Sequence, residues 1–483
     1  MSIYDTYEPV IGLEVHAQLS TLSKAYSSDS TEFGAMPNSN ISVTTLGHPG
    51  TLPFFNKKIV EFAVKLGLAV KAEIRNVNHF ARKNYFYADL PKGYQITQDT
   101  TPVCSGGFIP ITLENGTKKK INLIRIHWEE DAGKSMHDVD PFDTLIDLNR
   151  AGVPLLEIVS HPDIRSGEEA YAYLTEVRRL VRYLEICDGN MEEGSLRCDA
   201  NISVRKRGEE KYGRRVEVKN MNSIRNVQRA IEFEIKRQID EIEAGGIIAQ
   251  DTRSFDAVAG TTFTLRSKEA ANDYRYFPEP DLCPVVITDK YIQETKATMP
   301  LLPAELIEKY TQQLSLSEYD ANVLTDDKYI ALYFEEILKH TKNYKSAANW
   351  LSVNVKSYLN ENAISIKQFN LPAVRIAEII NLIDEGKISH TIASQKVFPA
   401  IVASPAISPL EYAQQNNLIQ EGDADTIIAF AVEVIAKYPD KVSEYKSGKT
   451  GLLGLFVGDV MKLSKGKADP KIVNSVIKDL LEK

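Results

Sequence analysis

Near its start the chain carries the stretch Ile11-Gly12-Leu13-Glu14-Val15-His16-Ala17-Gln18-Leu19. The odd-numbered residues of this stretch are apolar, and Glu14, His16 and Gln18 alternate with them. Because successive side chains of a β-strand point to opposite faces, the alternation predicts a strand that buries its apolar set. The other face would then present Glu14, His16 and Gln18 together. The stretch thus predicts a sheet core with a polar surface behind it.

The same alternation returns further along the chain, at 124–127, 197–204 and 216–219. Within 197–204, Arg197, Asp199, Asn201 and Ser203 would share one face. Clean alternation is typical of antiparallel strands that pack one face on a core and leave the other face open. We therefore expect a largely antiparallel sheet in this part of the chain.

Two helices are predicted between these strands. Ser166 and Glu169 form a capping-box pattern ahead of an apolar stripe with helical spacing. A second apolar stripe runs over 224–242 and stops at Gly245-Gly246, a common kind of helix end. Strands and helices in this arrangement predict an α+β fold.

The remainder of the chain reads as helical. Prolines punctuate 276–284 and 299–303, after which helical periodicity takes over, and 403–409 has the composition of a linker. We predict three parts. They are a large N-terminal domain with an antiparallel sheet and helices (1–295), an all-α domain (296–408) and a small all-α tail domain (409–483).

Composition limits the class of protein. The chain has 483 residues, 43% hydrophobic and 25% charged, which is ordinary for a soluble globular protein. No stretch approaches the roughly 20 apolar residues of a membrane span, and the N-terminus lacks the pattern of a signal peptide. The four cysteines lie far apart without a CxxC pair, which argues against disulfides. A cytoplasmic location is the expectation.

Charge is unevenly distributed along the chain. The net charge of −9 argues against unspecific coating of nucleic acid. From Lys441 to the end, however, nine lysines face five acids. Such a basic segment could meet phosphates, although a solvated lysine-rich helix face explains the composition equally well.

Carboxylates concentrate beside the predicted strands, and Glu157 stands alone within the apolar run 154–159. A lone carboxylate in an apolar segment needs a cation or hydrogen-bond donors, and several acids together favour a divalent metal. Oxygen-rich sites suit Mg²⁺, especially beside nucleotide phosphates. Alternatively, the acids face water and Glu157 pairs with Arg150 or Arg165. The candidate acids besides Glu157 are Glu14 (with His16), Glu129, Glu130, Asp131, Glu192, Glu193 and Asp199.

The stretch Arg82-Lys83-Asn84-Tyr85-Phe86-Tyr87 joins cations to aromatics. It could hold phosphates through Lys83 and stack a base, or form an ordinary strand with aromatic packing. No GxSxG motif is present, and no cysteine stands in a nucleophile motif. Nothing in the sequence predicts a glutamine-hydrolysing site.

Six stretches resemble, in order, the motifs of one known family, the B subunit of the aspartyl/glutamyl-tRNA(Asn/Gln) amidotransferase. The resemblance runs nearly end to end. The stretches are 11–16 (IGLEVH), 82–87 (RKNYFY), 127–135 (HWEEDAGKS), 147–159 (DLNR with PLLEIV), 191–201 (MEEGSLRCDAN) and 273–281 (DYRYFPEPD).

The resemblance implies an assembly, a heterotrimer with an amidase-type partner (the family's A subunit) and a small partner (its C subunit). The amidase-type partner would release ammonia from glutamine, which explains the missing glutaminase motif. The B subunit would use Mg-ATP to phosphorylate the side-chain carboxylate of glutamate or aspartate on tRNA(Gln) or tRNA(Asn), and ammonia would then displace phosphate. The tail (409–483) would contact the tRNA. Such an assembly allows translation without direct charging of these tRNAs.

The resemblance also implies roles for individual residues. Glu14, His16, Glu130 and Glu157 match the family's metal-site positions and, with Lys83, are the expected catalytic residues. Glu192, Glu193 and Asp199 would form a second group of metal-binding acids. Lys83, Asp199 and Asn201 would bind the nucleotide. Many members carry zinc-binding cysteines near 26–29 and 42–46, where this chain has none, so we expect no zinc.

Two other functions remain open. An ATP-grasp-like amide ligase would explain the acids, but not the basic tail or the lack of a glycine-rich phosphate loop. A tRNA-binding scaffold without chemistry of its own would explain the tail, but would leave Glu157 and the acidic strand face without a purpose.

Overall fold

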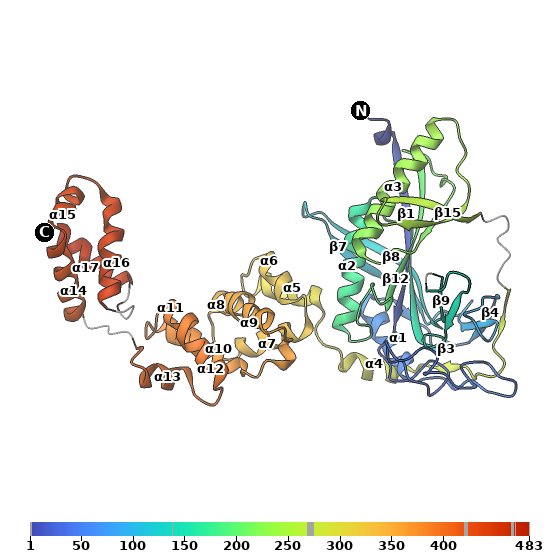
Figure 1. Cartoon of the computed structure of the whole chain (residues 1–483), viewed down its shortest axis with the longest axis horizontal. Coiled ribbons are helices and arrows are strands. Elements are labelled where there is room, and N and C mark those ends of the chain that lie inside the picture. Colours follow the sequence, from blue (N-terminus) through green and yellow to red (C-terminus); the bar gives the residue numbers. More distant parts are fainter. Residues whose placement is uncertain are drawn as a thin grey trace. The chain divides into compact units, whose positions relative to one another are not determined.

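The computed structural model describes residues 2–137, 139–267, 275–419, 424–464, 468 and 470–482. The chain forms two compact units, Met1–Leu302 and Pro303–Lys483 (Figure 1). The motif residues Asp273 and Tyr274 and the tail lysines Lys465, Lys467 and Lys483 lie outside the described residues. Among the described helices, none is both long and apolar enough to cross a membrane.

A ten-stranded sheet forms the centre of the first unit, in the order β15-β14-β13-β12-β1-β11-β8-β6-β2, with β7 also paired to β8. Every pairing in it is antiparallel except the parallel pair β13 and β14. The strands are β1 (Tyr7–Gln18), β2 (Glu73–Ile74), β6 (Cys104–Ser105), β7 (Phe108–Thr112), β8 (Lys118–Glu130), β11 (Pro154–Ser160), β12 (Leu196–Lys206), β13 (Val216–Lys219), β14 (Asp251–Asp256) and β15 (Thr261–Ser267).

Among the described residues of this unit, three smaller sheets accompany the large one. The one that matters for the site has the order β16-β4-β5, because it carries side chains that reach the open face of the large sheet. Its strands are β4 (Ala81–Asn84), β5 (Tyr94–Thr97) and β16 (Arg275–Pro278). The other two pair β9 (Lys134–Met136) with β10 (Leu145–Asp147), and β3 (Val77–Asn78) with β17 (Val285–Val286).

Helices cover the apolar face of the large sheet. Leu13 and Val15 of β1 are buried there, as predicted from the alternation, and they belong to one core with Tyr173 and Val227 from the helices. Figure 1 shows α2 and α3 alongside the strands. The helices of this unit are α1 (Lys58–Ala69), α2 (Gly167–Tyr183), α3 (Ile224–Glu243) and α4 (Asp289–Ala297), preceded by the 3-10 turn Ile3–Thr6.

The ends of α2 and α3 follow the predicted signals. The Ser166 side chain accepts a hydrogen bond from the backbone of Glu169 at 3.1 Å and so caps α2. The Glu169 carboxylate, however, accepts from the backbone of Arg165, one residue before the position that a full capping box requires. Helix α3 stops at Ala244 ahead of Gly245, whose φ of 82° favours glycine.

The described elements of the second unit are all helical, which confirms the predicted α+β class for the chain. Helix α13 packs on α10, whereas α14, α16 and α17 surround a separate core that contains Ile427, Phe456 and Val473. The α-helices are α5 (Pro303–Gln312), α6 (Glu318–Leu324), α7 (Lys328–Leu338), α8 (Tyr344–Asn349), α9 (Lys356–Glu361), α10 (Ala373–Asp384), α11 (His390–Ile392), α12 (Phe398–Ala403), α13 (Pro409–Gln415), α14 (Ala424–Lys437), α15 (Pro439–Lys446), α16 (Leu453–Leu463) and α17 (Pro470–Glu482). Wider π turns (Trp350–Val355, Ala393–Val397) and 3-10 turns (Ile366–Gln368, Thr450–Leu452) connect some of them.

One buried carboxylate ties α3 to the edge of the large sheet. Glu234 is fully buried, pairs with Arg237 at 2.5 Å and accepts a hydrogen bond from Thr262 of β15 at 2.9 Å. Arg253 of β14 lies 3.6 Å from the same carboxylate. Removing one partner of a buried ion pair leaves the other charge buried without compensation, which strongly destabilises a fold. We therefore expect this contact to stabilise the edge of the sheet.

We expect Glu234→Ala to lower the free energy of unfolding of the first unit by about 3–5 kcal/mol, because Arg253 loses its carboxylate at the sheet edge and Arg237 keeps only its pair with Glu241. Urea unfolding followed by circular dichroism measures the change. The matched control is Glu232→Ala on the exposed side of the same helix. An equal loss in both variants would contradict the structural role of Glu234.

Candidate active site

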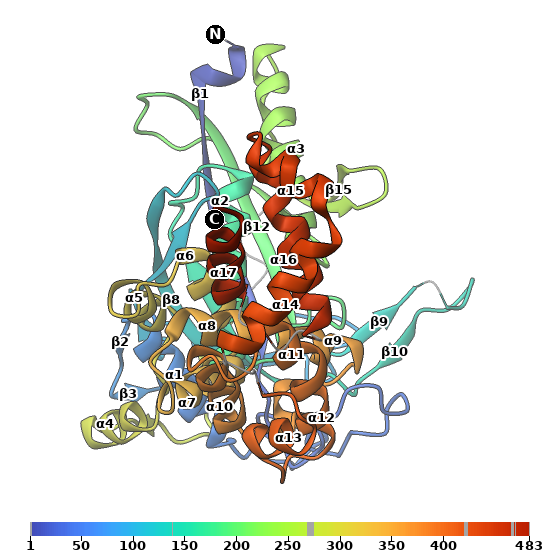
Figure 2. The same cartoon turned by 90° about the vertical axis from the view of Figure 1, so that its left-hand side faces the viewer.

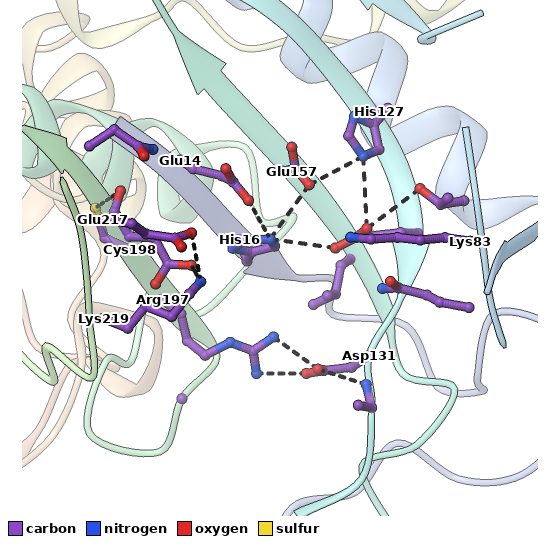
Figure 3. Close-up of a pocket in the computed structure, with 18 of the residues that line it drawn as sticks. Glu14, His16, Lys83, His127, Asp131, Glu157, Arg197, Cys198, Glu217 and Lys219 are labelled. Carbon is purple, nitrogen blue, oxygen red and sulfur yellow. Dashed lines mark hydrogen bonds and ion pairs between the residues drawn. The ribbon is translucent and has the colours of Figure 1, made fainter. Parts of the chain in front are cut away.

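The polar face of the large sheet forms the floor of a cavity of about 1210 Å³. Strands β1, β8, β11, β12 and β13 supply the floor, and the small sheet contributes Lys83 and Tyr276. Figure 3 shows acidic, basic and imidazole side chains from neighbouring strands pointing toward one another. The cavity is therefore built where the alternation of β1 predicts a polar surface.

The strand register brings residues far apart in sequence into rows. His16 of β1 stands opposite Glu157 of β11 on one side and Arg197 of β12 on the other. Glu157 in turn stands opposite His127 of β8. Two residues before His16 on β1, Glu14 stands opposite Asp199 of β12. Antiparallel pairing thus collects these groups from four strands on one face.

Three carboxylates converge on the imidazole of His16. Its Nε2 lies 3.6 Å from Glu14 Oε1, 3.5 Å from Glu129 Oε1 and 3.6 Å from Glu157 Oε2. His127 Nε2 lies 3.3 Å from Glu157 Oε2 and 3.7 Å from Glu129 Oε2. We call these five residues the carboxylate–imidazole cluster (Figure 3).

The surroundings of the cluster shift the pKa values of its two imidazoles and of Glu157. Burial lowers the pKa of His16, but its hydrogen bond to Glu157 and the charges of Glu129 and Glu14 raise that pKa to about 9. Burial likewise opposes charging of His127, and Glu157 and Glu129 raise its pKa to about 9. Burial raises the pKa of Glu157, yet the two imidazoles hold it below its usual range. In the metal-free cluster, two imidazolium ions therefore face three carboxyl groups at neutral pH.

Glu130 departs from its expected place in this group. It lies on the opposite face of β8, where its carboxylate pairs with Lys92 and accepts from the backbone N–H of Ile96 at 2.8 Å. The adjacent residue Glu129 reaches the cavity instead. The physical reason is the two-residue period of the strand, which sends consecutive acids to opposite faces.

The other predicted acids separate into two groups. Glu192 and Glu193 are exposed in the turn before β12, where their backbone N–H groups donate to Asn190, and neither lines the cavity. Asp199 and Asn201 do line the cavity. Asp199 pairs with Lys219 of β13.

Lys83 lines the cavity from β4, and its register partner on β16 is Tyr276, which also lines it. Burial raises the pKa of Tyr276, the charge of Lys83 opposes this rise, and Glu157 adds to it, so the phenol lies within electrostatic reach of the cluster. Arg82 joins the same two strands through a bidentate pair with Glu279, at 2.6 and 3.0 Å.

Four cavity residues received no site role in the sequence-based prediction, although Glu129 and Asp131 were among the candidate acids and Arg197 was placed on the polar face of its strand. The alternation of 124–127 continues for two more residues and so places His127 and Glu129 on the same face. This pattern is the signal that could have identified them. Asp131 and Arg197 form a bidentate pair at 2.7 and 2.9 Å between β12 and the end of β8. That pairing joins segments far apart in sequence, and no local pattern predicts it.

The donor set of the cavity can be compared with the needs of a metal ion. Two triads have ligand atoms within 4.8 Å of one another, Glu14–His16–Asp199 and His16–Glu129–Glu157. Carboxylate oxygens predominate in both, which fits Mg²⁺. A cation bound at His16 would require the neutral imidazole and hence release of its proton.

The segments 26–29 and 42–46 carry a hydrogen-bonded centre. Asp29 accepts hydrogen bonds from the Ser42 backbone at 2.9 Å, the Ser42 hydroxyl at 2.8 Å and the Ser27 hydroxyl at 3.0 Å, and also from Thr45. These side chains offer no thiolate or imidazole for zinc.

The fold and the site together define a class of protein. Its first unit is α+β and carries a charged cavity on the open face of its sheet, and helices follow this unit. The family model described as GatB/GatE catalytic domain matches residues 9–293, and the model described as GatB domain matches residues 332–481.

Curated relatives named as the B subunit of aspartyl/glutamyl-tRNA(Asn/Gln) amidotransferase match along the full length. The relative from Thermodesulfovibrio yellowstonii is 48% identical over 99% of this chain and 99% of its own. The relative from Persephonella marina is 48% identical over 99% and 100%, and that from Pseudomonas savastanoi pv. phaseolicola is 49% identical over 99% of each chain. The chain belongs to the family of aspartyl/glutamyl-tRNA(Asn/Gln) amidotransferase B subunits.

The raised pKa values of His16 and His127 predict a pH dependence of stability in the metal-free protein. An imidazole titrates at about pH 6.5 in the unfolded chain and at about 9 in the cluster. Because the folded pKa is the higher one, the stabilisation is complete below about pH 6.5 and is lost as the pH rises through about 9.

We expect proton NMR titration of the metal-free protein to show both imidazoles still charged at pH 7.5. In Glu157→Gln, both pKa values should fall because a negative charge 3.6 Å from His16 and 3.3 Å from His127 is removed. Neutral imidazoles at pH 7.5 in the unaltered protein would contradict the charge balance described for the cluster.

Proposed function

We propose that this chain phosphorylates the side-chain carboxylate of glutamate or aspartate carried on tRNA, using ATP, and that ammonia from a glutamine-hydrolysing subunit then displaces phosphate to give the amide. The observation that carries the proposal is the convergence of Glu14, Glu129 and Glu157 on His16 in a cavity lined by cations. The relatives' printed names, which specify aspartyl- and glutamyl-tRNA, support the substrate class.

Phosphorylation answers a specific chemical difficulty. A carboxylate oxygen is a poor leaving group for an incoming amine, whereas the oxygen of an acyl phosphate leaves readily as phosphate. Transfer of a phosphoryl group depends mainly on positioning and on neutralisation of charge. Lys83, Arg125, Arg197 and Lys219 line the cavity and can meet the phosphates and the substrate carboxylate.

Glu129, Glu157 and His16 are the residues that would hold Mg²⁺, with Glu14 and Asp199 beside them. A bound Mg²⁺ would supply positive charge next to the nucleotide phosphates. In this assignment Glu129 replaces Glu130, and Glu192 and Glu193 have no part in metal binding. Tyr276 and Tyr85 line the same cavity and offer aromatic faces for a base or ribose.

The helical part of the chain would then bind the tRNA. Lys437, Lys441 and Lys449 lie on α14, α15 and the turn after α15, although each is paired to an acid of the same module. Phosphates could exchange with those acids as partners of the lysines. A scaffold function alone would leave the carboxylate–imidazole cluster without a task, which is why we favour catalysis. A cytoplasmic heterotrimer with the amidase-type and the small partner completes this proposal.

We expect Glu157→Gln to lower tRNA-dependent ATP hydrolysis by at least about 100-fold, because the cluster loses a charge that neighbours both imidazoles. Glutaminase activity of the assembled complex should persist. Glu129→Gln should behave like Glu157→Gln, whereas Glu130→Gln should retain tRNA-dependent phosphorylation. The measurement is phosphate release with misacylated tRNA, and full phosphorylation by Glu157→Gln would remove this residue from the site.

A truncated chain tests the role of the tail. Because α13 packs on α10, the chain should end after Leu418 rather than at Pro409, so that the preceding helices keep their cover. We expect chain 1–418 to bind tRNA at least about tenfold more weakly, with a shallower dependence of log Kd on log salt concentration, since phosphate contacts are removed. Filter binding measures both, and unchanged binding would contradict the role of the tail.

A further inference from the structure

The small sheet β16-β4-β5 places a row of three side chains on the cavity. Tyr276 of β16 and Gln95 of β5 are the register partners of Lys83 of β4, and all three line the cavity. Figure 3 shows the Lys83 side chain extending toward the carboxylate–imidazole cluster. We call Tyr276, Lys83 and Gln95 the cavity row. The position of the small sheet therefore decides where these side chains stand relative to the cluster.

The Gln95 end of the cavity row is supported by the large sheet. Strand β5 contacts β8, and the Gln95 amide donates to the backbone carbonyl of Glu130 at 2.5 Å. The backbone N–H of Ile96 donates to the Glu130 carboxylate at 2.8 Å. The neighbouring strands β9 and β10 extend away from the body of the unit as a hairpin and add no strand to the small sheet (Figure 2). Contacts with β8 thus fix this end of the row.

The Tyr276 end has little support from its own strand. Strand β16 has four residues and, among the described strands, pairs with β4 alone at the edge of the small sheet. All four residues are exposed, Tyr276 at 43%. Pro278 has no backbone N–H to donate to the ladder. Because a short exposed edge strand gains little stability from backbone pairing alone, side-chain contacts have to hold β16 in place.

The strongest of these contacts is an ion pair behind the cavity row. Glu279 directly follows β16, and its side chain has no exposed surface. Its carboxylate accepts hydrogen bonds from Arg82 Nε at 2.6 Å and from Arg82 Nη2 at 3.0 Å. The guanidinium of Arg82 also lies over the ring of Tyr94 on β5, 4.2 Å from its centroid. Because bidentate pairs are among the strongest and most specific hydrogen-bonded contacts, Arg82 ties all three strands together.

Arg82 and Glu279 lie on the face of the small sheet that is turned away from the cavity. Arg82 precedes Lys83 on β4, and consecutive side chains of a strand point to opposite faces. Neither Arg82 nor Glu279 lines the cavity, whereas Lys83 and Tyr276 do. The pair can therefore influence chemistry in the cavity only through the placement of the cavity row.

We propose that Arg82 and Glu279 are positioning residues for phosphoryl transfer. Their pair holds β16 against β4 and so keeps Lys83 and Tyr276 at the wall of the cavity, where Lys83 would meet the nucleotide phosphates. A displacement of about 1 Å in such a site can cost on the order of 100-fold in rate. This inference rests on the proposed function, because that function supplies the nucleotide.

The test compares Glu279→Gln with Asp281→Asn in the full chain, assembled with its partner subunits. Each variant removes one negative charge beside the same guanidinium, since Asp281 Oδ2 lies 3.0 Å from Arg82 Nη2. The Asp281 side chain is 37% exposed, however, and the Arg82–Glu279 pair persists in this control. We expect the KM for ATP in tRNA-dependent ATP hydrolysis to rise at least about tenfold in Glu279→Gln and to stay within about threefold in Asp281→Asn.

The KM for misacylated tRNA separates positioning from loss of folded protein. It should stay within about threefold in both variants, because the cavity row is expected to contact the nucleotide. Partial unfolding would lower kcat and leave both KM values unchanged. Arg82→Lys is the second variant, since lysine keeps the charge but cannot form the bidentate pair, and its KM for ATP should also rise.

A disulfide tests whether the pair acts by holding β16. The Glu279 N–H donates to the carbonyl of Phe80 at 3.0 Å, so the next register partners, Ala81 and Pro278, form a non-hydrogen-bonded pair with close Cα atoms. Ala81→Cys and Pro278→Cys are added to Glu279→Gln, together with Cys283→Ser to remove the exposed cysteine. We expect the oxidised chain to regain a KM for ATP within about threefold of the unaltered value, and the reduced chain to lose it again.

An unchanged KM for ATP in both Glu279→Gln and Arg82→Lys would overturn the proposal, and so would a raised KM that the disulfide does not restore. An unaltered complex that hydrolyses no ATP with misacylated tRNA would contradict the proposed function instead. Hydrogen exchange of the Phe277 amide then decides whether the pair holds β16. Faster exchange in Glu279→Gln would support that role, and equal exchange in the variant and the unaltered chain would overturn it.

Discussion

Everything at the proposed site depends on the position of β1 between two antiparallel neighbours. Pairing with β11 and β12 places His16 opposite Glu157 and Arg197, and it places Glu14 opposite Asp199. A buried carboxylate alone is costly, and three near one imidazole are tolerable only because cations stand among them. Shifting β1 by one residue would turn Glu14 and His16 into the core and Leu13 and Val15 into the cavity. The apolar core therefore fixes the register that assembles the acids.

The same register explains why the two faces of the sheet have different roles. The apolar face packs on α2 and α3, which leaves the polar face free to form a cavity over five strands. The small sheet contributes Lys83 and Tyr276 to this face, and the pair between Arg82 and Glu279 ties its strand β4 to the end of β16. The site is thus assembled from strands throughout the first unit. Apolar packing on the opposite face of the sheet offsets the free-energy cost of burying its charged groups.

Features that depend on local periodicity or on the chemistry of single residues could be predicted from the sequence. The α+β class, the polar face of β1 and the ends of α2 and α3 follow from alternation, helical spacing, Ser166 and Gly245. Features set by pairing between distant segments were out of reach. The alternation of 124–127, continued by two residues, does separate Glu129 from its neighbour Glu130, but it leaves open which strands stand beside β8. The Asp131–Arg197 pair, the turn position of Glu193 and the parallel pair of β13 and β14 also depend on tertiary arrangement.

The chain belongs to the family of amidotransferase B subunits, and it combines a charged cavity in the first unit with a helical second unit. The central claim is that the carboxylate–imidazole cluster is the metal and nucleotide centre. Crystals grown with Mn²⁺ and a non-hydrolysable ATP analogue test it directly through the anomalous scattering of manganese. The account predicts a peak bonded to the carboxylates of Glu129 and Glu157 beside His16. A nucleotide-bound peak on the opposite face at Glu130, or outside the cavity, would contradict it.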